Sequence, residues 1–157
     1  MKRVLFISST GGHLSELLQL KCMFNDYDYM LVTEKTKSNM YLSDKYKGRV
    51  KYLTYGTKDR QKLLYPFRLL YNSFKSLFIY LKFHPDYIIT TGTHTAGPMC
   101  LIGKIFKSKI IYIETFANIH TKTITGKLLY PISDLFIVQW PSMKELYEKS
   151  VYGGWIY

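Results

Sequence analysis

Three ionisable side chains follow apolar segments at positions where they could do chemistry. His13 comes directly after Gly11 and Gly12, His94 lies in the glycine-containing segment 92–98, and Glu114 follows the apolar run 110–113. An imidazole exchanges a proton near neutral pH, so His13 is a candidate general base or a contact for a substrate hydroxyl. A lone carboxylate is costly to bury, so Glu114 is expected to be either exposed in a crevice or paired, where it could orient a substrate or His13.

The two glycine segments are predicted to be strand-to-helix turns. Residues 4–7 form an apolar run typical of a strand buried on both faces, and helical spacing of leucines follows Gly12. The run 87–91 leads in the same way into residues 92–98. Ligands of open parallel sheets bind at the carboxyl ends of the strands, so the two turns are expected to bracket one crevice. In an alternative reading, His94 simply caps the helix that follows it.

Strand-like and helical segments alternate along the whole chain, which predicts an α/β fold with right-handed crossovers. We expect a Rossmann-like open parallel sheet of about six strands with helices on both faces, formed by residues 1–157 as one domain. The expected strands are residues 4–7, 29–33, 50–53, 87–91, 110–113 and 135–138. Cys22 and Cys100 fall within apolar helical patterns and are expected to be reduced core residues, and neither cysteines nor histidines have metal-ligand spacing.

The segment 60–83 is both basic and apolar. The chain has a net charge of +11, and no acidic residue lies between Asp59 and Asp86. We expect this helix to lie in a membrane interface, the alternative being a long buried helix whose lysines extend to water. The membrane contacts would be three basic residues spaced by seven and three aromatic ones: Arg68, Lys75, Lys82, Phe67, Phe74 and Phe78. No nucleic-acid-binding motif is present, so no nucleic acid is expected as a partner, and RNA binding by the basic segment is a distant alternative.

The last residues, 151–157, are strongly apolar for the end of a chain. Such a segment calls for a surface to bury against, and we expect it to dock onto a partner protein. The alternative is that the segment folds back as an edge strand of its own sheet. The residues expected to dock are Tyr152, Trp155, Ile156 and Tyr157.

Three motifs carry a resemblance to a known family: Thr10-Gly11-Gly12-His13 after the first strand, the segment 92–98, and the run Glu114 to Ala117. They resemble the N-terminal, acceptor-side half of GT-B glycosyltransferases of the MurG type. They are more similar still to subunits that form only this half of a split enzyme. These are the exopolysaccharide subunit PssD, the capsular β-1,4-galactosyltransferase enhancers and the membrane subunit of the eukaryotic two-part N-glycan GlcNAc transferase.

The resemblance implies where an acceptor would bind. The implied contacts are Thr10, Gly11, Gly12, Gly92, Thr93, His94, Gly97, Thr115 and Asn118. Asn118 stands where eukaryotic members commonly carry Arg, and His120, Lys122 or Lys127 could supply positive charge instead. The chain would need no cofactor of its own, because the nucleotide sugar would bind mainly to the partner.

The resemblance also implies a function. The chain would recruit a PssE-like catalytic half to the membrane and present a polyprenyl-pyrophosphate-linked sugar, in capsule or exopolysaccharide synthesis with β-1,4-galactosyl or related hexosyl transfer. His13 would be the base, although a base supplied by the partner is equally compatible. Met1 leads into the first strand without a charged and apolar leader, so we expect a peripheral protein on the cytoplasmic face of the plasma membrane. A self-sufficient homodimeric transferase that uses His13 is the main alternative.

Overall fold

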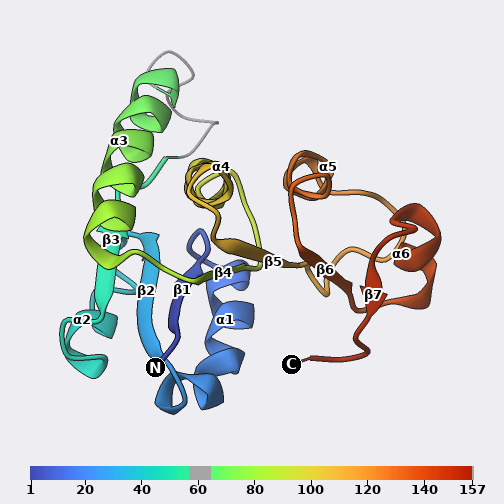
Figure 1. Ribbon diagram of the computed structural model, residues 1–157, viewed down its shortest axis with the longest axis horizontal. Coiled ribbons are helices and arrows are strands. Elements are labelled where there is room, and N and C mark those ends of the chain that lie inside the picture. The colour runs from blue at the N-terminus through green and yellow to red at the C-terminus, as the bar shows by residue number, and fades with distance from the viewer. Residues whose placement is uncertain (57–64, 157) are drawn as a thin grey trace.

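The computed structural model describes residues 1–56 and 65–156. They form a parallel sheet of seven strands in the order β3-β2-β1-β4-β5-β6-β7 (Figure 1). This confirms the expected fold class, and the strand beyond the predicted six is β7, which pairs with β6 at the edge of the sheet. The strands are β1 (Arg3–Ile7), β2 (Asp28–Glu34), β3 (Val50–Leu53), β4 (Tyr87–Thr90), β5 (Lys109–Ile113), β6 (Leu135–Val138) and β7 (Val151–Tyr152).

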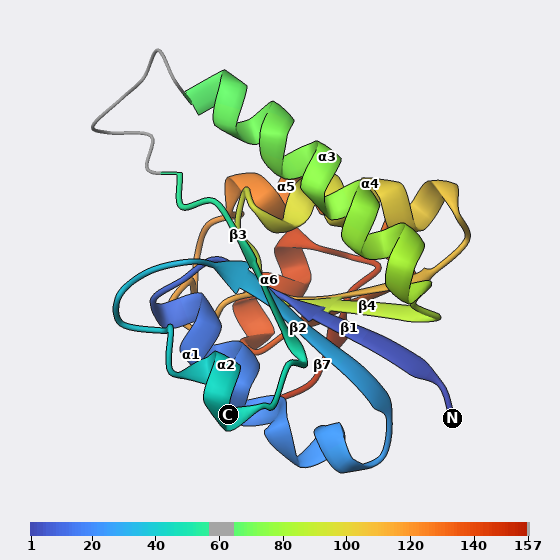
Figure 2. The same ribbon diagram turned by 90° about the vertical axis from the view of Figure 1, so that its left-hand side faces the viewer.

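The helices lie on both faces of this sheet. Helices α3, α4 and α5 cover one face, and α1 and α2 cover the other (Figures 1 and 2). The helices are α1 (Gly12–Gln19), the 3-10 helix η1 (Leu20–Asn25), α2 (Leu42–Lys45), α3 (Tyr65–Phe83), α4 (Ala96–Ile105), α5 (Ile124–Leu129) and α6 (Pro141–Leu146). The expected basic helix is present as α3, and residues 60–64 of the expected span lie outside the described residues.

Strand β1 shows why the sheet is covered on both faces. Successive side chains of a strand point to opposite faces, and Leu5 and Ile7 pack into the core under α3 and α4. Val4 and Phe6 pack into the second core, which α1 supplies with leucines. All four side chains are at most 2% exposed, as the uninterrupted apolar run predicted.

The two cysteines have different surroundings. Cys100 lies fully buried in α4, and its burial raises the pKa of the thiol to about 12. Cys22 is exposed, so the prediction of a core position was wrong. Residues 20–25 form a 3-10 helix instead of continuing α1, and three residues per turn replace the 3.6-residue period that had placed Cys22 on the buried face.

Strand order reverses between β1 and β4. The chain moves outward from β1 through β2 to β3, returns through α3 to β4 on the other side of β1, and then continues outward to β7. Such a switch point leaves a crevice at the carboxyl ends of the two central strands, where ligands of open α/β sheets bind. The turns at Gly11 and Gly92 follow these two strands.

Candidate functional site

The two glycine turns meet at the switch point, as predicted. The Ser9 N–H, just beyond β1, donates a hydrogen bond to the Gly92 carbonyl oxygen, just beyond β4, at 3.4 Å. Gly11 and Gly92 have φ angles of +82° and +95°, in the left-handed region that favours glycine. A Cβ on Gly92 would lie 3.3 Å from the Tyr112 hydroxyl and 3.8 Å from the His13 ring. Both the backbone conformation and the neighbouring side chains therefore favour glycine at position 92.

His13, in the first turn of α1, is held across the switch point by Thr91. Its Nδ1 lies 2.8 Å from the Thr91 carbonyl oxygen, and the Thr91 hydroxyl donates to the His13 carbonyl oxygen at 2.8 Å. A carbonyl oxygen only accepts, so we assign the proton of the neutral ring to Nδ1. Nε2 is then the basic nitrogen, and no residue in the described part of the chain hydrogen-bonds to it. The ring is thus oriented as a general base requires.

Glu16 is a member of the site that the sequence reasoning missed. Its Oε1 accepts from the Thr115 hydroxyl at 2.7 Å and from the Phe116 N–H at 3.1 Å, which ties α1 to the segment after β5. Its Oε2 is buried without a hydrogen-bond partner among residues 1–56 and 65–156 and lies 3.7 Å from His13 Nδ1. The spacing of three residues, which puts both side chains on one face of a helix, could have revealed the pair.

Glu34 is a second missed residue, and it connects the loops that surround the crevice. It ends β2 and is only 2% exposed. Its carboxylate accepts from the Thr95 hydroxyl at 2.8 Å, the Gly56 N–H at 3.3 Å and the Thr10 N–H at 3.4 Å. These donors follow β4, β3 and β1, respectively. Glu34 thus sets the relative positions of three loops, and a carboxylate at the carboxyl end of an apolar strand was the available signal.

His94 belongs to the same group of loops. Its Nε2 lies 3.2 Å from the Gly56 carbonyl oxygen and 3.7 Å from Glu34 Oε1. The ring therefore bridges to the loop after β3, and the residue at the N-cap of α4 is Thr95, which makes no side-chain capping bond. Thr93 is half-buried beside it, with its hydroxyl 3.5 Å from His94 Nδ1.

Glu114 is paired, which is one of the two expected situations. It is 1% exposed, and its carboxylate accepts from the Thr123 hydroxyl at 3.0 and 3.1 Å and from the Tyr147 hydroxyl at 3.0 Å. Burial raises the pKa of Glu114, while these hydrogen bonds oppose the shift. The partner of His13 is Glu16, and Glu114 makes no hydrogen bond to His13 in the described part of the chain. Glu114 thus joins the segment after β5 to α5 and α6.

The remaining predicted contacts lie at the starts of α1 and α4 and in the loop after β5. Gly11 and Gly12 are exposed at the start of α1, and Gly97 is half-buried in the first turn of α4. The Asn118 side chain hydrogen-bonds to the Thr121 carbonyl oxygen and accepts from the Thr121 hydroxyl at 3.0 Å, so it closes its own loop.

A broad apolar surface lies next to this crevice. On α3, Phe67, Phe74 and Phe78 are 69%, 65% and 69% exposed. A groove of about 370 Å³ continues from the start of α3 to α4 and α5, where Leu101 and Ile124 are also exposed. Within residues 1–56 and 65–156, no helix has the length and apolarity needed to cross a bilayer.

The first residues of the C-terminal segment take up the edge-strand alternative, and docking onto a partner stays a prediction. Val151 and Tyr152 form β7, which is the edge-strand alternative. Ile156 then packs against the core, and its N–H donates to the Gln139 side chain at 3.2 Å. Trp155 packs edge-on against Phe116 but stays 70% exposed. Tyr157, also expected to dock, lies outside the described residues.

Comparison with solved structures supports the fold. The chain aligns with Acinetobacter baumannii MurG with a TM-score of 0.73 and 17% identity, over 90% of this chain and 43% of that one. It aligns with the UDP-GlcNAc 2-epimerase of Methanocaldococcus jannaschii with a TM-score of 0.68 and 15% identity, over 92% of this chain and 41% of the epimerase. The chain therefore has the Rossmann-like fold of one half of such proteins and spans less than half of their length.

Sequence comparison identifies the family. The mouse (Mus musculus) UDP-N-acetylglucosamine transferase subunit ALG14 is 30% identical over 97% of this chain and 82% of its own length. The human subunit is 30% identical over 96% of this chain and 81% of its own length. A family model described as "Oligosaccharide biosynthesis protein Alg14 like" matches residues 4–156. The chain, with its paired glycine turns and His13 at the switch point, belongs to the Alg14-like family.

Proposed function

We propose that this chain is the acceptor-side subunit of a two-part glycosyltransferase, active on a lipid-linked sugar at a membrane surface. The observation that carries the proposal is the position of His13. Its Nδ1 is held by the Thr91 carbonyl oxygen, so Nε2 is the basic nitrogen, and a Cβ at Gly11 or Gly12 would meet nothing within 4 Å in the described part of the chain.

The chemistry follows from that geometry. Nε2 of His13 takes the proton of an acceptor hydroxyl while the hydroxyl oxygen bonds to the anomeric carbon of a nucleotide sugar held by the partner. The bond from that carbon to the nucleoside diphosphate breaks, and the diphosphate leaves with the bonding electrons. The Thr91 carbonyl oxygen and the Glu16 carboxylate face the Nδ1–H side of the ring and stabilise the imidazolium that forms.

We assign the remaining loop residues to acceptor binding. Gly11 and Gly12 open the N-terminus of α1, where unpaired N–H groups favour an anion such as the pyrophosphate of the lipid-linked acceptor. The α1 first turn holds no acidic residue that would repel it. Thr93, His94 and Gly97 belong to the segment after β4, and the Glu34 carboxylate links this segment, through Thr95, to Thr10 in the loop after β1.

The membrane contact is assigned to the exposed face of α3, with Phe67, Phe74 and Phe78 as its apolar part. Aromatic side chains beside lysines are typical of a helix that lies in a membrane interface. A protein with this contact would be peripheral on the cytoplasmic face, where the lipid part of the acceptor would reach the crevice along the apolar groove between α3, α4 and α5.

The partner is expected to be a donor-binding half of the PssE type, docking on Tyr152 and Trp155, which are 47% and 70% exposed. Trp155 is 70% exposed beside Phe116 and Trp140, a cluster that a partner could cover. The substitution Trp155→Ala is expected to weaken retention of the partner at least tenfold, since buried tryptophans dominate interfaces. Ile105→Ala, on the remote α4, is the matched exposed apolar control. Equal retention by both variants would remove the docking site from the proposal.

The transferred sugar is the least constrained part of the proposal. The named relatives are subunits of UDP-N-acetylglucosamine transferases, which favours UDP-GlcNAc as the partner's donor. The capsular setting and β-1,4-galactosyl transfer stay predictions. Supplying the complex with UDP-GlcNAc and with UDP-galactose in parallel distinguishes the two donors.

The test of the proposed chemistry is the variant His13→Ala in the assembled complex. Loss of a general base typically lowers a rate by 10²–10⁴-fold, so the variant is expected to keep the partner and lose transfer. Gln19→Ala, at an exposed position at the other end of α1, serves as the control. Transfer by His13→Ala within threefold of wild type would assign the base to the partner.

A further inference from the structure

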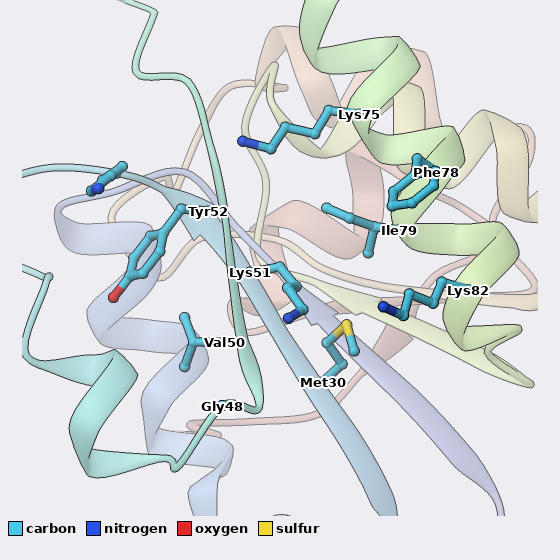
Figure 3. A pocket seen from close by; sticks show the side chains of 10 residues that line it. Met30, Gly48, Val50, Lys51, Tyr52, Lys75, Phe78, Ile79 and Lys82 are labelled. Atoms are coloured by element: carbon cyan, nitrogen blue, oxygen red, sulfur yellow. The ribbon is translucent and has the colours of Figure 1, made fainter.

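A second cleft lies away from the switch point, between the edge strand β3 and the second half of α3. It has a volume of about 610 Å³. Four lysines line it: Lys35 after β2, Lys51 on β3, and Lys75 and Lys82 on α3. Figure 3 shows Lys51 and Lys82 reaching from β3 and α3 into the space over Met30. No carboxylate lines this cleft in the described part of the chain.

The four ammonium groups are not neutralised by carboxylates in the described part of the chain. Across residues 1–56 and 65–156, none of them forms an ion pair, whereas Lys104 and Lys109 both pair with Asp134. The Lys75 ammonium lies 5.9 Å from the centre of the Tyr71 ring. Several positive charges along a low-dielectric wall focus a positive potential in the cleft. The cleft is therefore complementary to an anion of more than one charge.

The floor of the cleft is apolar. Met30, Val50, Phe78 and Ile79 lie between the lysines. A free inorganic anion gains nothing from such a floor, whereas a lipid phosphate would bury its glycerol and first methylenes there. Phe78 lines the cleft and is also 69% exposed on the face assigned to the membrane, so the cleft opens directly onto that face.

We propose that this cleft binds the phosphate group of an anionic membrane lipid. The lysines surround the phosphate and the apolar floor contacts the adjoining hydrocarbon. The proposal rests on the membrane contact proposed above, and it adds a discrete headgroup site on the sheet side of α3. Binding there would hold α3 flat on the bilayer and fix the direction in which the crevice faces.

Two soluble probes test the cleft without a bilayer. Dihexanoyl phosphatidic acid carries the phosphate with short acyl chains, and glycerol 3-phosphate carries the same phosphate without them. We expect the amide resonances of residues 50–52 and 75–82 to shift with the first probe, and the second to bind at least tenfold more weakly. Equal affinity for both probes would make this a site for a free phosphate, and no shift with either would overturn the proposal.

A charge-matched pair of variants separates the site from general attraction. Lys35→Gln with Lys51→Gln removes two charges from the sheet side of the cleft and leaves α3 intact. Lys21→Gln with Lys149→Gln removes two exposed charges elsewhere. On vesicles of phosphatidylcholine with phosphatidic acid, the first pair is expected to bind roughly tenfold more weakly than wild type and the second pair less than threefold more weakly. Equal losses would overturn the proposal.

The proposed membrane contact through α3 and the proposed headgroup site fail in different ways. If vesicles bind wild type and both lysine pairs equally, the membrane contact stands and the headgroup site is wrong. If the short-chain lipid shifts the cleft resonances but vesicles do not bind, the headgroup site stands and the contact through α3 is wrong. Phe67→Ser with Phe74→Ser, which lie outside the cleft lining, should abolish vesicle binding and leave the short-chain lipid bound.

Discussion

Replacing Glu34 by alanine should loosen the whole rim of the crevice. Its carboxylate is the acceptor for the Thr95 hydroxyl and for the N–H groups of Gly56 and Thr10. A buried donor left without its acceptor costs about 1–3 kcal/mol. Because the two N–H bonds are long, we assign about 1 kcal/mol to each and slightly more to the hydroxyl. The expected loss in the free energy of unfolding is thus about 3 kcal/mol.

Urea unfolding at pH 7 measures that loss directly. Glu34→Gln keeps one acceptor oxygen and should lose only about 1 kcal/mol of unfolding free energy, since only one of the donors then faces the amide nitrogen, which cannot accept a hydrogen bond. Glu145→Ala, at an exposed position on α6, should stay within about 0.5 kcal/mol of wild type. A Glu34→Ala variant as stable as Glu145→Ala would refute the role of Glu34 as the common acceptor of three loops.

Three further changes test other parts of the site and fold. Gly92→Ala puts a methyl group 3.3 Å from the Tyr112 hydroxyl at a φ of +95°; it should lower the free energy of unfolding by about 1–2 kcal/mol in urea titrations and lower transfer by the complex further. Burial raises the folded-state pKa of Glu114 above 4.5, so ionisation of this carboxyl destabilises the fold as pH rises. The free energy of unfolding of Glu114→Gln should therefore increase relative to that of wild type between pH 4 and 8. A difference between the two proteins that does not change with pH would contradict this. Burial alone would raise the pKa of Asp134, but a backbone N–H and two ammonium groups hold it at about 2. Asp134→Asn should therefore lower the free energy of unfolding by about 1 kcal/mol at pH 7, a value already reduced for solvent screening. The loss should become smaller as pH falls from about 5 towards 2.

The parts of the site that could be predicted depend on periodicity and on sheet topology. The apolar runs at 4–7 and 87–91 predicted β1 and β4, and the rule that ligands bind at strand carboxyl ends brought His13 and Gly92 together. These inferences need only local sequence patterns, because all strands of a parallel sheet have their carboxyl ends at the same edge.

The polar contacts could not be predicted in the same way. Glu34 and Glu114 both end apolar strands, yet only the three-dimensional arrangement shows that one binds loops from three strands and the other binds hydroxyls on α5 and α6. Cys22 was misplaced because a 3-10 helix interrupted the expected period. The headgroup cleft combines lysines from β3 and α3 that no spacing in the sequence connects.

The most direct test of the account is reconstitution of sugar transfer from purified components. This chain, its donor-binding partner and the two together are incubated with a nucleotide sugar and a polyprenyl-pyrophosphate-linked acceptor, and product is measured as an initial rate. The account predicts product only when both are present. Undiminished turnover by this chain alone would contradict it and favour the homodimeric transferase.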